Sequence, residues 1–399
     1  MKKYKLQNGL KIIELKRKSD IVTIHFTVHT GSNNEIPKIA GISHFVEHMV
    51  FEGTKNYNPQ EIANSIESLG GQLSAYTSNE VTCFFVKITK KHVEKALEIL
   101  SEIITKPSFE KKLVEKERPI ILSEIKMVQD EPRHHQWTLF YRSLFDEFPA
   151  KNPIYGNAKA VSSITQQDLI DYHKMHYTAP NSVVTVVGNI LNIKSKINKY
   201  FNNMNKQEIK LEFKQEKTNR PNKVIEKKKT NQSYVVLGYK TAKRDEKDSY
   251  VFDIIRAILG RGLSGKLFRT IRIDHGMAYD VGVHSDTNIT FGTFSAYFST
   301  NKKNIKKCID LTLKEFQKLK KITTKELKEA KQFIEGEFIL DEEDSHHFAR
   351  TLAEWELVSK AEDGLKYVKE INKVTKKDIT RVVNKYLNKD YSLAVIEQV

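Results

Sequence analysis

The sequence has few cysteines and no long apolar run, and these absences exclude several classes of protein. Its two cysteines, Cys83 and Cys308, lie far apart, which excludes a disulfide framework and a thiolate zinc site and suits a reducing compartment. No apolar run approaches the roughly 18 residues that a membrane helix needs. The lysine-rich first twenty residues resemble neither a secretory signal nor an anchor. We therefore expect a cytoplasmic protein with no membrane span.

The chain also lacks the motifs that would explain its positive charge as nucleic-acid binding. Its formal net charge is +16, which by itself predicts attraction to acidic polymers. However, acidic residues are interleaved with the lysines, as at 111–118, and we find no zinc-finger spacing and no aromatic ribonucleoprotein stretch. A solvated, lysine-rich surface is the preferred interpretation, with no specific nucleic acid as partner. A nucleic-acid-binding protein is the alternative, and its binding would depend strongly on salt.

The length and the order of elements predict two similar halves. A chain of 399 residues exceeds what a single hydrophobic core usually supports. Strand-like and helix-like patterns of the first half recur in the second, where residues 374–399 align with 164–189 at an offset of 210. Three identities mark this register: Thr165 with Thr375, Asp168 with Asp378, and Ser182 with Ser392. We predict an α+β fold of two homologous domains, each a mainly antiparallel sheet packed against helices.

A polar stretch from about 202 to 232 separates the two halves and is too hydrophilic to be buried. We therefore predict an N-terminal domain over 1–205, a linker over 206–230 and a C-terminal domain over 231–399. A charged edge strand at the start of this stretch is the competing interpretation.

The segment GISHFVEHMVFEGT, residues 41–54, places two histidines and an acid within five positions. We predict a helix over 41–52, and on a helix residues i and i+4 share a face, with Cβ atoms about 5–6 Å apart. His44 and His48 can therefore bind one Zn²⁺, with Glu47 beside them as a general base for a metal-activated water. The alternative is a helix whose histidines are satisfied in a core or lie at the surface.

A catalytic zinc site usually has three protein ligands and leaves a fourth position for water. Spacing alone does not select the third ligand, because the N-terminal half is rich in acids. The candidates are Glu52, Glu67, Glu80, Glu115, Glu117, Glu124 and Glu131.

The segment HFVEHMVFEGT resembles the inverted zinc motif of the pitrilysin/insulinase metallopeptidases, which include the mitochondrial processing peptidase. Other segments follow in the order of that family, so the resemblance covers nearly the whole chain: GGQLSAYTSNEVT, EKERPIILSEIKM, ITQQDLIDYHKMHYTAPNSVVTVVGN and LSGKLFRTIRIDHGMAYDVG. The length is similar to that of the short, two-domain members, such as the beta subunit of the processing peptidase. The resemblance implies a processing-peptidase-like fold and a zinc endopeptidase with one Zn²⁺ per chain.

The resemblance also implies roles for individual residues. The zinc ligands would be His44, His48 and Glu124, with Glu47 as the general base. Glu117 matches an acid that the family places behind the metal, although Pro119 would start or kink a helix between the two acids of this segment. The alternative for Glu117 is an ordinary solvated charge.

The second half resembles the family at Arg272 and Tyr279, which match an Arg and a Tyr that the family projects across the cleft onto the substrate or transition state. A guanidinium and a phenol can donate hydrogen bonds to an oxyanion that develops during catalysis. The alternative is an Arg on an exposed helix and a Tyr in a strand. His275 departs from the family, which often has a basic residue there.

The strand 72–78 resembles the edge strand along which the family pairs extended peptides by β-augmentation. Ser74 stands where the family commonly has Asn, and for Phe45 a core position is the alternative to a subsite. The substrate-binding residues would be Phe45, Ser74, Ala75, Tyr76 and Thr77.

The function that follows is cleavage of extended peptides or presequences by metal-activated water. A catalytically inactive peptide-binding or assembly subunit of the same fold is the alternative, but such relatives tend to have lost the motif that this chain retains. The short members of the family pair two chains, so we expect a homodimer or a pairing with a homologous subunit.

Overall fold

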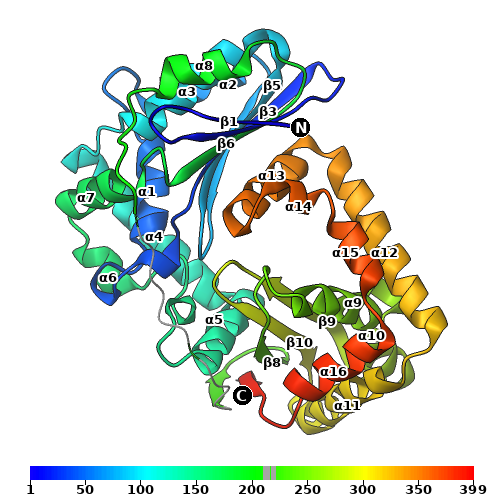
Figure 1. Ribbon diagram of the computed structural model, residues 1–399. Helices are drawn as coiled ribbons and strands as arrows, with labels where there is room; N and C mark the ends of the chain where they lie inside the picture. The colour runs from blue at the N-terminus through cyan, green and yellow to red at the C-terminus, as the bar shows by residue number, and fades with distance from the viewer. Residues whose placement is uncertain (210–215, 217–221) are drawn as a thin grey trace. The chain divides into compact units, whose positions relative to one another are not determined.

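The computed structural model describes residues 1–209, 216 and 222–399, which form two compact units (Figure 1). Each unit is built from segments that are distant in sequence. Unit 1 comprises Met1–Lys126, Asn152–Glu212 and Asp341–Gly364. Unit 2 comprises Met127–Lys151, Phe213–Leu340 and Leu365–Val399.

Unit 1 contains a six-stranded sheet in the order β1-β2-β6-β3-β5-β4. Neighbouring strands are antiparallel except β2 and β6, which are parallel. Because β4 pairs only with β5, it is an edge strand, as predicted for 72–78. The strands are β1 (Lys2–Lys5), β2 (Lys11–Leu15), β3 (Ile21–Val28), β4 (Gln72–Thr77), β5 (Thr82–Thr89) and β6 (Ser182–Val187).

Helices and the sheet of unit 1 enclose its main hydrophobic core, to which β3 contributes Ile24 and Phe26. The opposite face of β3 carries Thr23 and His25. Two helices from late in the chain, α13 (Ser345–Val358) and α14 (Ala361–Gly364), belong to the same unit. The other helices are α1 (Ile42–Phe51), α2 (Pro59–Glu67), α3 (Val93–Thr105), most of α4 (Lys111–Asp130), α6 (Ala158–Ser163), α7 (Gln166–His176) and α8 (Ile193–Phe201).

Unit 2 contains a five-stranded sheet in the order β7-β11-β8-β10-β9, in which only β7 and β11 are parallel. Its strands are β7 (Lys223–Lys228), β8 (Ser233–Thr241), β9 (Ala278–Thr287), β10 (Gly292–Thr300) and β11 (Ser392–Gln398). Its helices are α5 (Pro132–Leu144), α9 (Asp248–Gly260), α10 (Lys266–Phe268), α11 (Ile305–Lys318), most of α12 (Thr324–Glu343), α15 (Tyr367–Lys373) and α16 (Lys376–Tyr386).

The predicted repeat of two α+β halves is confirmed in detail. Thr165 caps α7 and Thr375 caps α16, each by a capping box with the Asp three residues later. Ser182 and Ser392 begin β6 and β11. The aligned register therefore marks the same helix cap and the same strand start in both halves.

Two sequence-based expectations differ from the structure. Residues 223–228, inside the predicted linker 206–230, form the edge strand β7, in which exposed and partly buried residues alternate. The strand falls near the end of the polar stretch, whereas an edge strand at its start was the competing interpretation. Positions 210–215 and 217–221 of the predicted linker lie outside the described residues.

The compact units also differ from the predicted contiguous domains, because α5 belongs to unit 2 and α13 with α14 belongs to unit 1. The apolar faces of these helices find partners that are distant in sequence, and a linear pattern does not show this exchange. Helix α4 continues through Pro119, which therefore does not separate two helices. None of the helices described here has the length and apolar character to span a membrane.

Candidate metal centre

Helix α1 presents its polar residues on one side because its apolar residues are buried on the other. Phe45, Val46 and Met49 pack into the main core of unit 1. Their spacing leaves His44 and His48 one turn apart on the face toward α4. Phe45 is completely buried, so it occupies the core position that was the alternative to a subsite.

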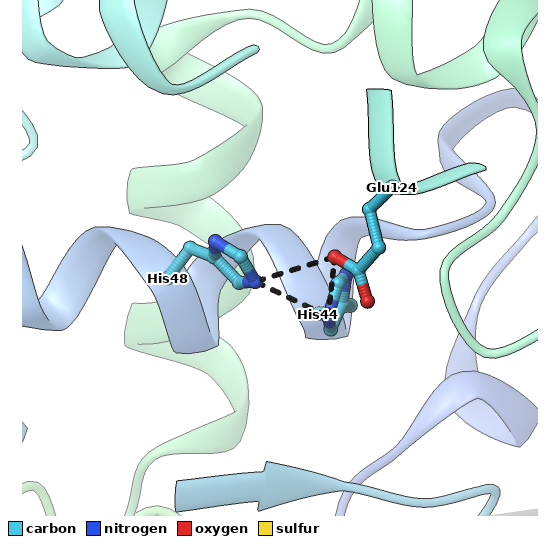
Figure 2. A group of neighbouring side chains, drawn as sticks. All are labelled: His44, His48 and Glu124. Carbon is cyan, nitrogen blue, oxygen red and sulfur yellow. Dashed lines mark hydrogen bonds and ion pairs between the residues drawn. The ribbon is translucent and has the colours of Figure 1, made fainter. Parts of the chain in front are cut away.

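The two imidazoles of α1 and one carboxylate of α4 converge (Figure 2). His44 Nε2 lies 3.2 Å from His48 Nε2, and Glu124 Oε2 lies 3.7 Å from the first and 3.8 Å from the second. The point in their plane that is equally far from all three atoms lies about 2.1 Å from each of them. Zinc binds imidazole nitrogen and carboxylate oxygen at about 2.0–2.2 Å. The residues present therefore fit one zinc ion.

Among the described residues, only one of the seven candidate acids has a carboxylate oxygen close enough to both histidines to share a metal ion with them. It is Glu124, the residue implied by the family resemblance. Others have different contacts: Glu52 pairs with Lys116, and Glu115 pairs with Arg118. Glu131 caps the start of α5.

A second acid of α4 holds the orientation of His48. Glu117 Oε1 lies 2.8 Å from His48 Nδ1, and its side chain is only 8% exposed. Because an ionised carboxylate only accepts hydrogen bonds, His48 Nδ1 carries the proton and Nε2 keeps a lone pair for a metal. Although burial acts to lower it, the pKa of His48 is raised by this hydrogen bond and by nearby carboxylates.

The other imidazole has a less polar environment. The side chain of His44 is 12% exposed, and burial, followed by the proximity of His48, lowers its pKa to about 4. It is therefore neutral at pH 7, the form that binds metals. Its Nδ1 atom is buried and has no hydrogen-bond partner among the residues described.

The predicted general base is held by the edge strand. Thr77 Oγ1 of β4 donates a hydrogen bond of 2.5 Å to Glu47 Oε2. Burial raises the pKa of Glu47, and the hydrogen bond from Thr77 opposes that rise. The threonine was predicted to bind substrate, but its hydroxyl contacts Glu47, a relation that strand alternation alone did not reveal.

The remaining predicted substrate residues lie along β4. Ser74 is exposed, whereas Ala75 packs against the main core. Tyr76 is hydrogen-bonded to Cys83, and burial raises the pKa of its phenol. Since β4 pairs with β5 on one side only, its outward backbone groups have no strand partner among the strands that the structure describes in unit 1.

Arg272 and Tyr279 lie together in unit 2. The Arg272 guanidinium donates a hydrogen bond of 2.7 Å to the backbone oxygen of Tyr279 and lies 4.3 Å from the centroid of its ring. The Tyr279 side chain is exposed at the start of β9. Their approach to the metal-binding group of unit 1 stays a prediction.

Comparison with known proteins identifies the family. Residues 11–158 match the family described as Insulinase (Peptidase family M16), and residues 163–334 match the family described as Peptidase M16 inactive domain. An uncharacterized zinc protease of Bacillus subtilis is 30% identical over 99% of this chain and 98% of its own length. An uncharacterized zinc protease of Rickettsia felis is 34% identical over 74% of this chain and 72% of its own.

Solved structures share the fold. A crystal structure of a protease from Helicobacter pylori has a TM-score of 0.93 at 23% identity and covers 99% of both chains. A structure described as the peptidase M16 inactive domain from Pseudomonas fluorescens has a TM-score of 0.92 at 18% identity, covering 100% of this chain and 98% of its own. The chain therefore belongs to the insulinase/pitrilysin peptidase family, M16, in its short two-domain form.

Proposed function

We propose that this protein is a zinc-dependent endopeptidase whose active site is the group on α1 and α4. The observation that carries the proposal is the convergence of His44 Nε2, His48 Nε2 and Glu124 Oε2 on a circle of zinc-bonding radius. The names of the relatives, which are zinc proteases, support zinc for the family. We expect one zinc per chain, with a fourth position left for water.

Beside the three ligands lie residues that would transfer the proton and orient the base. A zinc ion held by His44, His48 and Glu124 would act as a Lewis acid, which would lower the pKa of water and polarise a carbonyl. Glu47 takes a proton from the attacking water and delivers it to the leaving amine. Burial raises the pKa of Glu47, which makes it a stronger base than an exposed carboxylate, and the hydrogen bond from Thr77 engages one of its two oxygens.

Substrate would bind to the edge strand β4. An extended peptide pairs with its outward backbone groups, which requires no particular side chain in the peptide. This favours peptides or presequences as substrates, since both are extended and unfolded. Arg272 and Tyr279 of unit 2 would donate hydrogen bonds to the developing oxyanion. We also propose that the protein forms a homodimer or pairs with a homologous subunit, and that it is cytoplasmic.

The first experiment compares zinc content and cleavage of quenched fluorescent peptides for wild type and Glu47→Gln. We expect wild type to carry about one zinc and to cleave. Glu47→Gln should keep zinc, because Glu47 is not a ligand, and should lose about 10²–10⁴-fold in kcat. Glu110→Gln, an exposed acid just before α4, is the matched control and should cleave normally.

The opposite results are equally clear. A wild type that binds no zinc, or a Glu47→Gln variant that cleaves as well as wild type, would overturn the proposal. An inactive peptide-binding or assembly subunit of the same fold would then be the better account.

A further inference from the structure

Helix α1, which carries His44 and His48, has no side-chain hydrogen bond from its own N-cap residue. The residue before α1 is Gly41, which has no side chain to accept hydrogen bonds from the first turn. Its φ of 99° is in the left-handed region that favours glycine. The first N–H groups of an α-helix lack partners within the helix, so they must find acceptors elsewhere.

A buried carboxylate from outside the helix accepts these hydrogen bonds. Glu35 Oε2 accepts from the backbone N–H of Gly41 at 2.6 Å, and Glu35 Oε1 accepts from the N–H of Ser43 at 2.8 Å. Glu35 is only 9% exposed. Burial raises the pKa of Glu35, and the hydrogen bonds from these N–H groups oppose that rise. Because both of its oxygens accept from backbone N–H groups, the geometry favours the ionised carboxylate. The positive end of the helix is therefore the partner of this carboxylate.

Other contacts fix the same helix end. Ser43 Oγ lies 2.7 Å from the hydroxyl of Tyr172 on α7. A Cβ atom at Gly41 would lie only 2.7 Å from the backbone oxygen of Tyr155, and a Cβ at Gly156 would collide with the backbone oxygen of Ala40. The chain entering α1 thus crosses residues 155–156 at a distance that only glycines allow.

The position of this helix end determines the geometry of the site. A shift of one residue along an α-helix rotates its side chains by about 100° and moves them by about 1.5 Å. Zinc sites tolerate deviations of only about 0.2 Å in ligand distance. His44 follows Ser43 directly, so its Nε2 atom depends on where the first turn is held.

We propose that Glu35 is a positioning residue, which holds the N-terminus of α1 where His44 meets Glu124 and where Glu47 meets Thr77. This inference rests on the proposed function of the metal-binding group. It differs from the role of Glu117, which contacts the imidazole of His48 itself.

The test is Glu35→Gln, measured beside Glu102→Gln. In the first variant one acceptor oxygen is replaced by an amide NH₂, which cannot accept from a backbone N–H. Glu102 is the matched control because it is buried in the same unit on α3, and its carboxylate accepts from Asn56 and Lys106 rather than from α1. Glu35→Asp, which keeps the charge on a shorter side chain, replaces Glu35→Gln if that variant does not fold.

Three measurements distinguish positioning from a general loss of stability. We expect Glu35→Gln to weaken zinc affinity in chelator competition and to lower kcat, each about tenfold or more, with KM within about twofold. Hydrogen exchange should become faster in residues 41–47. Glu102→Gln should lower the melting temperature without changing zinc affinity or kcat.

The inference is overturned if Glu35→Gln loses thermal stability as the control does and keeps the zinc affinity and kcat of wild type. A wild type that binds no zinc would overturn the proposed function instead. In that case hydrogen exchange of residues 41–47 still tests whether Glu35 holds the N-terminus of α1. Unchanged exchange in Glu35→Gln would contradict this role.

Discussion

Corresponding helices in the two units hold a carboxylate at the same place, but its partner differs. Helices α4 and α12 each have 20 residues, and Glu124 and Glu337 are each the fourteenth. In unit 1 Glu124 faces two imidazoles of α1. In unit 2 Glu337 accepts a hydrogen bond of 2.6 Å from the guanidinium of Arg256 on α9. A permanent cation thus neutralises in unit 2 the acid that in unit 1 is free to bind a metal.

The supporting acid is also missing from the second helix. Seven residues before Glu124 stands Glu117, whereas seven residues before Glu337 stands the buried Ala330. A guanidinium needs no partner to fix a tautomer, because all its nitrogens are donors. One helix arrangement can therefore hold either a metal-binding group or a structural ion pair, depending on a few side chains.

The helices that come from the other half of the sequence are held differently as well. Helix α13 contacts the sheet of unit 1 through hydrogen bonds of Ser345 with Thr23 and of His346 with His25, beside a small apolar cluster. Helix α5 packs on the sheet of unit 2 mainly through aromatic and aliphatic side chains, including Phe140. Helix α5 also makes polar contacts with its sheet, such as that between His135 Nε2 and Glu226 Oε2 of β7 at 2.9 Å.

The largest expected effect tests whether unit 2 takes part in the chemistry. If the proposed roles hold, Arg272→Ala and Tyr279→Phe should each reduce kcat by about 10²–10³-fold, because each would remove a proposed donor to the developing oxyanion. Zinc content should not change. Arg269→Ala is the matched control, since this exposed arginine lies on the same short helical segment. Variants with the kcat of wild type would exclude unit 2 from catalysis.

The next effect concerns the acid that unit 2 lacks. Glu117→Gln should weaken zinc affinity by about 10–100-fold, because the amide no longer fixes the tautomer of His48 as a carboxylate does. Glu115→Gln, on the same helix but exposed and paired with Arg118, should leave zinc affinity unchanged. Chelator competition measures both, and equal shifts in the two variants would show that Glu117 has no specific role.

A smaller effect is a different response of the two units to acid. Burial lowers the pKa of six histidines of unit 1, strongly for five of them and less for His346, so the unfolded state binds protons before the folded state does. Their stabilising contribution is complete above pH 6.5 and is lost as the pH falls, by on the order of 1 kcal/mol for each of the five between pH 7 and pH 5. The values are about 3 for His25 and about 4 for His29, His44, His173 and His176.

In unit 2 the pKa of His284 is raised by its hydrogen bond to Asp286, so acid favours the folded form there. Glu35, Glu47 and His48 of unit 1 also have raised pKa values, but the histidines with lowered pKa values outnumber them. Hydrogen exchange at pH 7 and pH 5, corrected for intrinsic rates, should therefore show protection falling more in β3 and β6 than in β8 and β10. Equal losses in the two sheets would contradict this difference.

The sequence predicted the parts of the site that depend on local spacing. The i and i+4 histidines follow from helical spacing and the repeated halves from the order of elements, while the family resemblance singled out Glu124 and the edge strand β4. The exchange of α5 and α13 was not predicted, because it depends on which sheet buries each helix. The contacts of Glu35 with Gly41 and of Thr77 with Glu47 were not predicted either, because they depend on how the intervening chain folds back onto α1.

The most direct test of this account is the zinc content of Glu124→Gln and Glu337→Gln beside wild type. The two variants make the same change at the same position of corresponding helices. We predict about one zinc per chain in wild type and in Glu337→Gln, and zinc lost from Glu124→Gln, because a catalytic site needs its third ligand. Zinc retained at full affinity by Glu124→Gln, or lost from Glu337→Gln alone, would contradict the assignment of the metal to unit 1.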